Sequence, residues 1–268
     1  MVNLSRFSLE GKVALVTGGS RGIGRATALG FAEAGADVVV ASRKLPDLEE
    51  VADEIRGVGR KALPVAAHIG RMEDIGRLVE TATAEFGRID ILVNNAGTNP
   101  AMALVLDTDE RLWDSIMNLN LKGAYFLSQA AARVMKEHGG GKIINVASAD
   151  GYRPEYAVGI YSIGKAALVM MTKSMAFELA AFNIRVNGIA PGAVSTRILD
   201  SHWFHLPEDE AKAEKAELAK MVPLQYVGEP EEMVGAMIYL ASDASSYTTG
   251  ETILVDGGML LGSAPIVH

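Results

Sequence analysis

Short runs of apolar, largely β-branched residues recur along this chain, separated by longer segments whose apolar positions have helical spacing. Runs of this kind predict strands that are buried on both faces, and the amphipathic segments between them predict covering helices. We expect seven strands, at residues 13–17, 37–41, 62–66, 89–94, 142–146, 184–189 and 253–255. Because strands and helices alternate, the pattern predicts an α/β fold with a doubly wound parallel sheet and helices on both of its faces.

The length and composition of the chain are those of one globular domain. It has 268 residues, of which 49% are hydrophobic and 22% are charged. We find no proline- or serine-rich linker, no internal repeat and no low-complexity tract. Since α/β chains of roughly 250 residues often form one domain, we expect residues 1–268 to share a single core.

The charge of the chain argues against a nucleic-acid partner. The net charge is -8 and the pI is about 5.2, whereas nucleic-acid binders concentrate Lys and Arg on one face. The N-terminal residues lack the apolar core of a signal peptide, and no apolar run approaches the ~18 residues of a membrane span. We therefore expect a cytoplasmic protein without a membrane partner.

Metal catalysis is not indicated by the sequence. The chain has no cysteine, which excludes disulfides, thiolate metal sites and cysteine nucleophiles. His202 and His205 are the only close pair of histidines. Without neighbouring thiols, we expect them to be loop residues rather than metal ligands.

A glycine-rich segment at residues 17–24 follows the first expected strand and opens a helical pattern that runs to about Ala34. Backbone N–H groups and the helix dipole favour an anion at such a helix N-terminus. Glycine also lets the backbone approach the pyrophosphate of a dinucleotide. The strand before it and the helix after it favour this interpretation over an ordinary tight turn.

Other candidate residues follow the expected strands. The carboxyl ends of parallel strands meet at one edge of the sheet, where ligands of such sheets bind. Residues 18–24, Arg43, residues 94–97, Ser148 and residues 191–196 each follow an expected strand. They are therefore predicted to converge on one site.

Tyr161 and Lys165 are four residues apart in a segment with helical spacing, which places both side chains on one helix face. A free tyrosine has a pKa near ~10 and is a poor base at neutral pH. A neighbouring cation favours the phenolate and lowers this pKa. The pair predicts a proton-transfer site. Taken alone, the two residues also fit a surface tyrosine beside a solvated lysine.

These motifs, in this order, resemble the short-chain dehydrogenase/reductase superfamily over nearly the whole chain. The matching segments are residues 17–24, residues 94–97, Asn120, Ser148, Tyr161 with Lys165, residues 191–192 and residues 250–257. The resemblance implies a Rossmann-type fold and hydride transfer between a nicotinamide and a carbonyl or secondary alcohol. Residues 38–44, 67–70, 98–100 and 227–230 look most similar to the NADPH-dependent carbonyl/retinal reductase branch.

The resemblance also implies a role for each catalytic residue. Tyr161 would donate a proton to the carbonyl oxygen, and Lys165 would acidify Tyr161 and hydrogen-bond the nicotinamide ribose. Ser148 would orient the substrate oxygen, and Asn120 would hold a water in a proton relay from Lys165 to solvent. By residue type alone, Ser148 is a turn residue and Asn120 is a helix cap.

The cofactor is expected to contact residues from every motif. The resemblance implies Gly18, Ser20, Arg21, Gly22, Ile23, Gly24, Ser42, Arg43, Lys44, His68, Ile69, Asn94, Ala96, Gly97, Tyr161, Lys165, Pro191, Gly192, Val194 and Thr196. Many members carry Asp-Val where this chain has His68 and Ile69. Because a histidine also hydrogen-bonds and stacks, and the carbonyl reductase branch has a similar histidine, we expect adenine binding to differ only in detail.

The residues at the end of the second strand determine whether NAD or NADP is preferred. NAD selectivity generally requires a carboxylate there, whereas the 2′-phosphate of NADP needs a cation. This chain has Ser42 followed by Arg43, and arginine binds phosphate in a bidentate manner. Arg21 resembles the second basic residue of NADP-preferring members. We expect NADP(H) to be favoured over NAD(H), unless both arginines are solvated surface residues.

The substrate is not specified by the motifs. Its walls are expected at residues 99–101, 149–156 and 197–221. The last segment contains Trp203 and Phe204 and is predicted to form a lid, although both aromatic side chains also fit packing on the body or on another subunit. The apolar tail at residues 259–267 is expected to cover a neighbouring subunit, as in related tetramers, which favours a homotetramer.

Three functions fit these observations. The first is an NADPH-dependent reductase of ketones, aldehydes or dicarbonyls. The second is an alcohol, sugar or hydroxysteroid dehydrogenase, or a 3-oxoacyl thioester reductase, for which the acidic net charge disfavours an acidic acyl carrier. The third is a nucleotide-binding sensor without catalysis, against which Asn120, Ser148, Tyr161 and Lys165 argue together.

Overall fold

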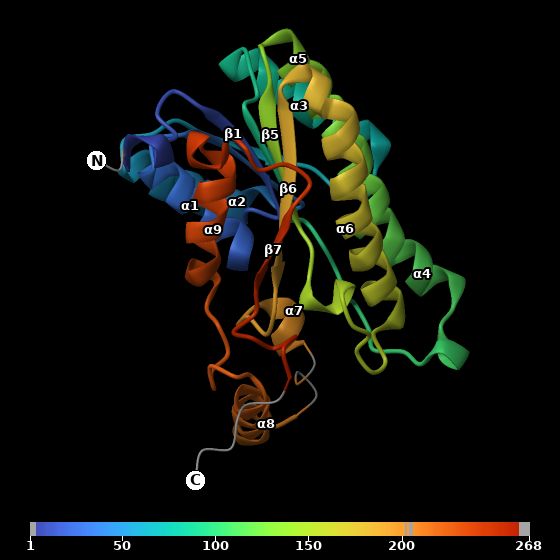
Figure 1. The fold of residues 1–268 in the computed structure, drawn as a ribbon. Helices are drawn as coiled ribbons and strands as arrows, with labels where there is room; N and C mark the ends of the chain where they lie inside the picture. The colour runs from blue at the N-terminus through green and yellow to red at the C-terminus, as the bar shows by residue number, and fades with distance from the viewer. Residues whose placement is uncertain (1–3, 202, 204–205, 263–268) are drawn as a thin grey trace.

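One parallel sheet organises the chain, whose computed structural model describes residues 4–201, 203 and 206–262. Across these residues the sheet has the strand order β3-β2-β1-β4-β5-β6-β7 (Figure 1). The strands are β1 (Val13–Thr17), β2 (Asp37–Ser42), β3 (Ala62–Ala66), β4 (Ile91–Asn94), β5 (Gly141–Val146), β6 (Ile184–Pro191) and β7 (Thr252–Val255). The predicted doubly wound, Rossmann-type sheet is confirmed.

The predicted strands differ from the observed ones only at their ends. β4 begins at Ile91 rather than at residue 89, and just before it Asp90 Oδ2 accepts a hydrogen bond from Val13 N at 2.9 Å. The Asp90 side chain therefore bonds the backbone of β1 at the position where the pairing of β4 with β1 begins. β6 continues to Pro191 because residues 188–191 pair with β7.

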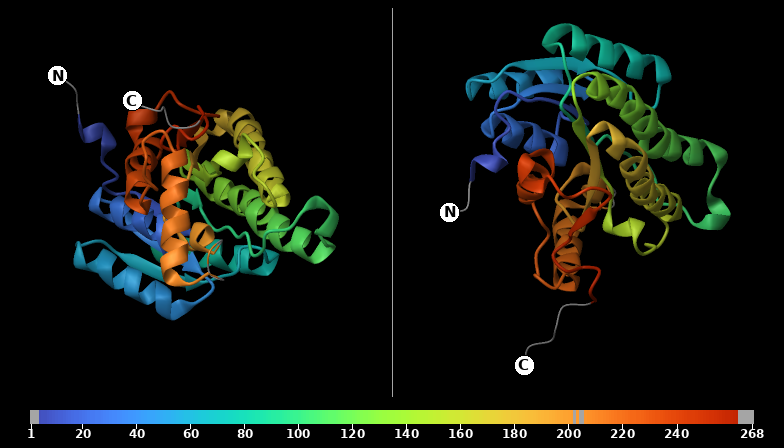
Figure 2. Two further views of the ribbon diagram at one scale, coloured as in Figure 1. Left: turned by 90° about the horizontal axis from the view of Figure 1, so that it is seen from below. Right: turned by 45° about the horizontal axis from the view of Figure 1, so that its top comes forward.

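Two layers of helices cover the sheet. α1 (Gly22–Glu33), α2 (Leu45–Gly57) and α9 (Val234–Ala241) pack on one face, and α3 (Met72–Phe86), α5 (Ala124–Glu137) and α6 (Gly159–Leu179) pack on the other. Figures 1 and 2 show the sheet between these layers. None of the helices in the described ranges is long and apolar enough to cross a membrane.

Alternate residues of the central strands face opposite layers. Leu15 and Leu92 belong to the buried cluster under α3, α5 and α6, whereas Val16 and Val93 belong to the cluster under α1, α2 and α9. Because both faces are covered, β1 and β4 are continuous apolar runs without a polar face.

The order of the strands fixes where a ligand can bind. β1 and β4 are neighbours in the sheet although two strands separate them in the chain. Open α/β sheets bind ligands at this switch point, outside the carboxyl ends of the strands. Beyond β6, the short helix α7 (Arg197–Asp200) and the longer helix α8 (Glu208–Met221) lie past the same edge (Figure 1).

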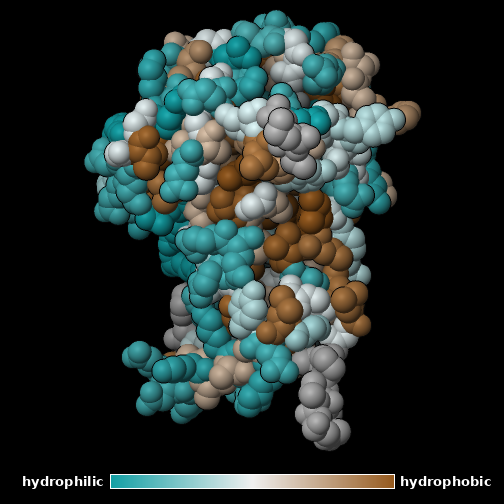
Figure 3. Space-filling view, turned by 60° about the vertical axis from the view of Figure 1, so that its left-hand side comes forward, coloured by the Kyte–Doolittle hydropathy of each residue, from teal (hydrophilic) through white to brown (hydrophobic). Residues whose placement is uncertain are grey.

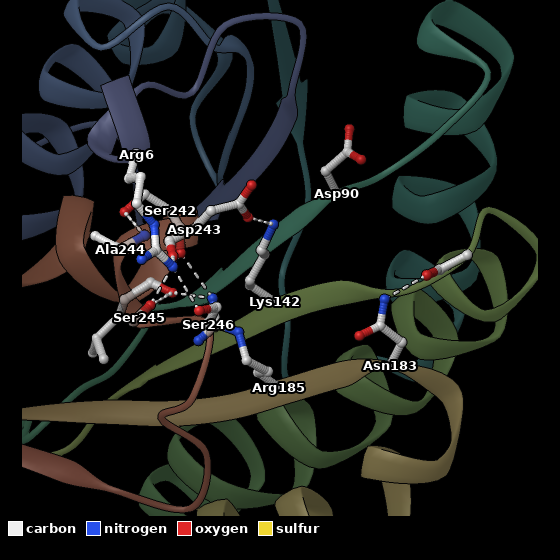
Figure 4. Close-up of polar contacts among 12 residues, drawn as sticks. Arg6, Asp90, Lys142, Asn183, Arg185, Ser242, Asp243, Ala244, Ser245 and Ser246 are labelled. Carbon is white, nitrogen blue, oxygen red and sulfur yellow. Dashed lines mark hydrogen bonds and ion pairs between the residues drawn. The ribbon is translucent and has the colours of Figure 1, made fainter. Parts of the chain in front are cut away.

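The opposite, amino edge of the sheet is closed by a polar cluster (Figure 4). Arg185, near the start of β6, donates to the carbonyl oxygens of Leu240, Ser242 and Thr248 at 3.2, 3.0 and 3.1 Å. These carbonyls lie at and beyond the C-terminal end of α9, where helix carbonyls lack intrahelical partners. The cluster ties α9 and the following loop to the sheet.

Candidate active site

A cavity of about 990 Å³ lies at the carboxyl edge of the sheet. Its volume is at the upper end of the range for ligand pockets. It brings together most of the residues predicted for the site, namely Gly18, Ser20, Arg21, Gly22, Ile23, Ser42, Arg43, Lys44, His68, Ile69, Ala96, Gly97, Ser148, Tyr161, Lys165, Pro191, Gly192, Val194 and Thr196. The predicted convergence on one edge therefore agrees with the position of the cavity.

Three predicted residues, Gly24, Asn94 and Asn120, are not part of the cavity wall. Asn94 is buried behind it, where its Nδ2 donates to Ser128 Oγ at 2.7 Å. At Gly24 an added Cβ would lie 2.3 Å from Gly18 O, so the missing side chain lets the glycine turn pack on α1. We therefore assign Gly24 and Asn94 to the packing behind the site rather than to its wall.

The glycine turn between β1 and α1 has a backbone conformation that leaves space at the start of α1. Gly18 and Gly22 have φ of 64° and 52°, a region that favours glycine. Asn95, which the sequence did not single out, donates to Thr17 O at 2.9 Å and to Gly18 O at 3.2 Å. An added Cβ on Gly18 would lie 2.7 Å from Asn95 Nδ2. This cradle and the start of α1 fit a dinucleotide pyrophosphate.

Basic side chains line the cavity at the ends of β2 and β3. Arg43 and Arg71 contribute to its wall there, and Arg21 lies 3.6 Å from Asp47 in an exposed ion pair. His68 Nδ1 accepts a hydrogen bond from Gly70 N at 3.1 Å. The imidazole is thus oriented by the backbone at the predicted adenine position. Arg71 was not predicted, because an arginine that directly follows a matching segment carries no signal of its own.

The loop that carries His68 is anchored to α3. Asp74 Oδ2 accepts a hydrogen bond from His68 N at 2.8 Å, and Asp74 Oδ1 accepts one from Arg77 at 2.6 Å. These bonds, the backbone one first, hold the pKa of Asp74 below its ordinary value. The carboxylate therefore stays ionised and fixes the start of the loop.

Tyr161 and Lys165 lie one turn apart on α6 and are buried, with 8% and 5% of their surface exposed. Lys165 Nζ donates to Val146 O, at the end of β5, at 2.7 Å. The same Nζ lies 5.5 Å from the centroid of the Tyr161 ring. Helical spacing brings the two side chains together, and the packing of α6 on the sheet removes them from water.

Burial, and not the neighbouring cation, dominates the electrostatics of this pair. Burial raises the pKa of Tyr161 above its ordinary value, the charge of Asp150 raises it further, and a hydrogen bond with Ser148 opposes both. Burial lowers the pKa of Lys165 to about 8, against an opposing effect of Asp150. In the protein without cofactor, desolvation outweighs a cation that is directed at a backbone carbonyl. That Lys165 acidifies Tyr161 stays a prediction.

Ser148 begins a short turn after β5, the 3-10 helix η4 (Ala149–Gly151). Its Oγ accepts a hydrogen bond from Asp150 N at 3.1 Å and donates one to Asp150 Oδ2 at 3.2 Å. The turn packs against α6, since an added Cβ on Gly151 would lie 2.9 Å from the Lys165 carbonyl carbon. Asp150 lies within residues 149–156, which were expected to form a substrate wall, but it was not singled out, because an aspartate two residues after a serine is typical of an ordinary turn.

Asn120 lies in a π-helical turn, η3 (Asn118–Gly123), between α4 (Glu110–Met117) and α5. Its Oδ1 accepts from Thr98 N at 2.8 Å and its Nδ2 donates to Thr98 O at 2.9 Å. An added Cβ on Gly97 would lie 3.5 Å from Asn120 Oδ1 and 3.7 Å from Lys165 Nζ. Asn120 and Lys165 thus flank the same glycine, and π-helical turns of this kind are frequent at functional sites.

The segment predicted as a lid forms α7 and α8. Arg197, Ile198, Leu199 and Ser201 line the cavity, and Lys215 of α8 donates to Ser195 Oγ at 2.7 Å. Trp203 is half-buried and is not among the residues that line the cavity. Phe204 and most of the apolar tail lie outside the described residues.

No metal site is found in the part of the chain that the structure describes, where no three His, Asp or Glu side chains are grouped to hold an ion. His202 and His205 lie outside the described residues. The polar groups of the cavity wall are amides, hydroxyls and charged side chains suited to a dinucleotide and an oxygen-containing substrate.

Known proteins resemble this chain over almost its full length. Residues 18–260 match the family model described as enoyl-(acyl carrier protein) reductase. The chain is 39% identical to dehydrogenase/reductase SDR family member 4 of Oryctolagus cuniculus, with 94% of this chain and 95% of the relative covered. It is 42% identical to 2-dehydro-3-deoxy-D-gluconate 5-dehydrogenase of Escherichia coli, with 96% and 98% covered.

Solved structures agree with the sequence relatives. L-sorbose reductase from Gluconobacter frateurii, in complex with NADPH and L-sorbose, superposes with a TM-score of 0.90 at 34% identity, with 95% of this chain and 98% of that chain covered. A short-chain type dehydrogenase/reductase from Mycobacterium marinum superposes with a TM-score of 0.87 at 43% identity, with 96% and 98% covered. The fold, the site and these similarities lead to one conclusion: the chain belongs to the short-chain dehydrogenase/reductase family.

Proposed function

We propose that the protein is an NADP(H)-dependent oxidoreductase that interconverts a carbonyl compound and a secondary alcohol, with Tyr161 as proton donor and acceptor. One observation carries this proposal: Tyr161, Lys165 and Ser148 converge with the glycine turn in a single cavity. A binding protein needs the glycine turn but has no use for a buried phenol and ammonium beside a serine hydroxyl. The convergence therefore favours catalysis over a nucleotide-binding sensor.

Each side chain has a chemical task in this proposal. NADPH, when bound, supplies the hydride that adds to the carbonyl carbon. Ser148 Oγ orients the substrate oxygen, and Tyr161 gives its phenolic proton to that oxygen as the C=O double bond becomes a single bond. Lys165 holds the nicotinamide ribose through its ammonium donors. Asn120 positions the relay that returns a proton to Tyr161, and the reverse reaction uses the same groups.

NADP(H) is the preferred cofactor in this proposal because of charge at the end of β2. Arg43 and Lys44 line the cavity there, and the strand ends in Ser42 rather than in a carboxylate. NADP was present in the structure of a gluconate 5-dehydrogenase from Burkholderia cenocepacia that is 35% identical to this chain. An arginine forms charge-assisted bonds to the 2′-phosphate that the ribose hydroxyl of NAD cannot replace.

Arg43→Ala tests this preference. We expect the ratio of kcat/KM with NADPH to that with NADH to fall by about tenfold or more, because a hydrogen bond to a charged group contributes roughly 1.5–3 kcal/mol. Steady-state rates with both cofactors measure the ratio. An unchanged ratio in Arg43→Ala would remove Arg43 from the 2′-phosphate site.

The function itself is tested by NADPH oxidation, with NADH in parallel, on a panel of carbonyl compounds. The panel contains aromatic ketones, α-dicarbonyls, a retinal, a keto-sugar, a ketosteroid and a 3-oxoacyl thioester. Turnover on one class supports the proposal and identifies the preferred substrate. NADPH binding without turnover on any member contradicts it and favours the sensor.

A sugar or polyol dehydrogenase is the second candidate within the same chemistry. The 42% identity to 2-dehydro-3-deoxy-D-gluconate 5-dehydrogenase and the similarity to L-sorbose reductase favour it. The similarity to dehydrogenase/reductase SDR family member 4 is of nearly the same strength. The carbonyl/retinal reductase branch therefore stays a prediction, as does the cytoplasmic location.

We also propose a homotetramer, in which a second copy covers an exposed apolar stripe on α6. Ile163, Met170 and Phe177 follow one another at intervals of seven residues and are 53%, 63% and 88% exposed. Large exposed apolar patches are typical of interaction sites.

A second face suits the other contact of a tetramer. β7 is one of the two edge strands of the sheet. Hydrophobic residues gather on the face that carries α9 and β7 (Figure 3). An uncovered edge strand presents unpaired backbone groups, which a second copy would shield. A monomeric mass in solution contradicts this part of the proposal.

A further inference from the structure

We propose that Asp150 is a specificity-determining residue that accepts a hydrogen bond from a hydroxyl group on the carbon next to the reacting carbonyl. The substrate class is then an α-hydroxy ketone, and in the reverse direction a vicinal diol. This inference rests on the proposed oxidoreductase function, since it uses the same cavity and the same Ser148.

The position of Asp150 is the first step of the argument. Asp150 lines the cavity together with Ser148 and Tyr161. Its Oδ2 lies 3.2 Å from Ser148 Oγ, the atom assigned to the substrate oxygen. In an α-hydroxy ketone the carbonyl oxygen and the hydroxyl oxygen lie side by side on adjacent carbons. Ser148 and Asp150 therefore offer adjacent partners to adjacent oxygens.

The chemistry of the two side chains matches this pair of oxygens. A carbonyl oxygen only accepts hydrogen bonds, and the hydroxyls of Ser148 and Tyr161 can donate to it. Ser148 has one proton, so while it donates to the carbonyl oxygen it no longer donates to Asp150 Oδ2. An ionised carboxylate only accepts, and Oδ2 is then an acceptor beside the reacting carbonyl. A substrate hydroxyl is the donor that suits Asp150. A plain ketone leaves this carboxylate with no bond from the substrate.

The charge of Asp150 also excludes a class of substrates. Asp150 lines the same cavity as Tyr161 and Lys165, and its negative charge raises the pKa of both. A carboxylate attached directly to the substrate carbonyl would lie against this charge, and like charges at close range repel. α-Keto acids are therefore poor substrates in this proposal.

The backbone holds Asp150 in place. Its N–H donates to Ser148 Oγ at 3.1 Å, and the following Gly151 has no room for a side chain against α6. The turn between β5 and α6 is thus packed rather than loose. L-sorbose, bound in the structurally similar reductase, is itself a ketone with a hydroxyl on the adjacent carbon.

The test compares matched substrates that differ by one group. Hydroxyacetone and butanone form one pair, and 2-hydroxyacetophenone and propiophenone form a second pair with an aromatic body. In each pair a hydroxyl replaces a methyl group next to the carbonyl. We expect the wild-type protein to favour the hydroxy ketone in kcat/KM, and Asp150→Ala to lower this preference by about tenfold or more, as the loss of a hydrogen bond to a charged group predicts.

Asp150→Asn separates recognition from charge. The amide keeps an acceptor oxygen, so we expect it to retain part of the preference for the hydroxyl. It removes the charge, so we expect pyruvate reduction to rise relative to hydroxyacetone. Glu85→Gln is the matched control, because it removes one negative charge from an exposed residue of α3 that does not line the cavity. We expect it to leave the hydroxyl preference unchanged.

The outcomes distinguish the inference from the function on which it rests. If Asp150→Ala lowers the rates of both members of each pair equally, Asp150 only orients Ser148 and the inference is wrong, while the oxidoreductase function stands. If butanone and propiophenone are reduced as well as the hydroxy ketones by the wild-type protein, the inference is also wrong. If NADPH binds and no carbonyl compound is reduced, the proposed function fails and the inference with it.

Discussion

Tyr161 and Lys165 show how burial sets the protonation of single residues in this site. The pKa of Tyr161 is raised by burial, so the phenol is protonated at neutral pH and is ready to donate a proton in the reductive direction. The pKa of Lys165 is lowered to about 8. In the protein without cofactor, the ammonium that would hold the cofactor ribose therefore begins to lose its proton just above neutral pH.

This value predicts a pH dependence of cofactor binding. Because the pKa of Lys165 is lowered, its ammonium is present below about pH 8 and is lost as the pH rises through that value. If only the ammonium form binds the ribose, the Kd for NADPH rises roughly fivefold between pH 8 and pH 9. Fluorescence titration of NADPH at each pH measures this change.

Lys165→Met is the control for that measurement. Without a titrating ammonium, its Kd for NADPH is expected to be weaker than that of the wild-type protein at pH 7 and flat across the same pH range. A wild-type Kd that does not change between pH 7 and pH 9.5 would show that the ammonium of Lys165 is not used in binding.

At the scale of elements, the strands could be predicted because β1 and β4 are buried on both faces and therefore appear as unbroken apolar runs. Their carboxyl ends then placed the candidate site. The sequence is less informative where the direction of one side chain matters. Asn94 belongs to a recognised motif, yet it is bonded to Ser128 behind the site, and a linear pattern does not say which way the last residue of a strand points.

Contacts between distant segments also could not be predicted from the sequence. Asp150 reaches the cavity that Tyr161 lines only because the turn after β5 packs against α6. Arg185 lies within a run that was expected to be an apolar strand, and its three carbonyl partners lie more than fifty residues away. A sequence pattern shows a polar residue at such a position but not its partners.

Arg185→Leu is expected to destabilise the fold without affecting the site. The carbonyls of Leu240, Ser242 and Thr248 lose the charged donor that ties them to β6, although each keeps a second donor, Ser245 Oγ or Asn187 Nδ2. A hydrogen bond to a charged group contributes roughly 1.5–3 kcal/mol. We expect the melting temperature, measured by calorimetry, to fall by several degrees. Because the cluster lies at the amino edge of the sheet (Figure 4), the Kd for NADPH at 25 °C should stay the same, and a changed Kd would contradict this separation.

At the scale of the whole molecule, the apolar stripe on α6 predicts self-association. Phe177→Asp places a charge on its most exposed member, at 88% exposure. We expect a lower mass by light scattering after gel filtration than for the wild-type protein, because a buried unpaired charge in an interface is strongly unfavourable. Val58→Asp, on the exposed end of α2, is the matched control and should keep the wild-type mass. Equal masses for all three proteins would contradict the assignment of this stripe to an interface.

The fold places the buried phenol of Tyr161 in the wall of the cavity, where a carbonyl substrate would lie beside the nicotinamide. The central claim is that Tyr161 transfers the proton in this arrangement. The most direct test is NADPH oxidation by Tyr161→Phe and by the wild-type protein with the best carbonyl substrate, together with NADPH affinity for both. The account predicts equal affinity and a rate lowered by roughly 10²–10⁴-fold, the usual contribution of a positioned general acid. A rate near that of the wild-type protein would contradict it.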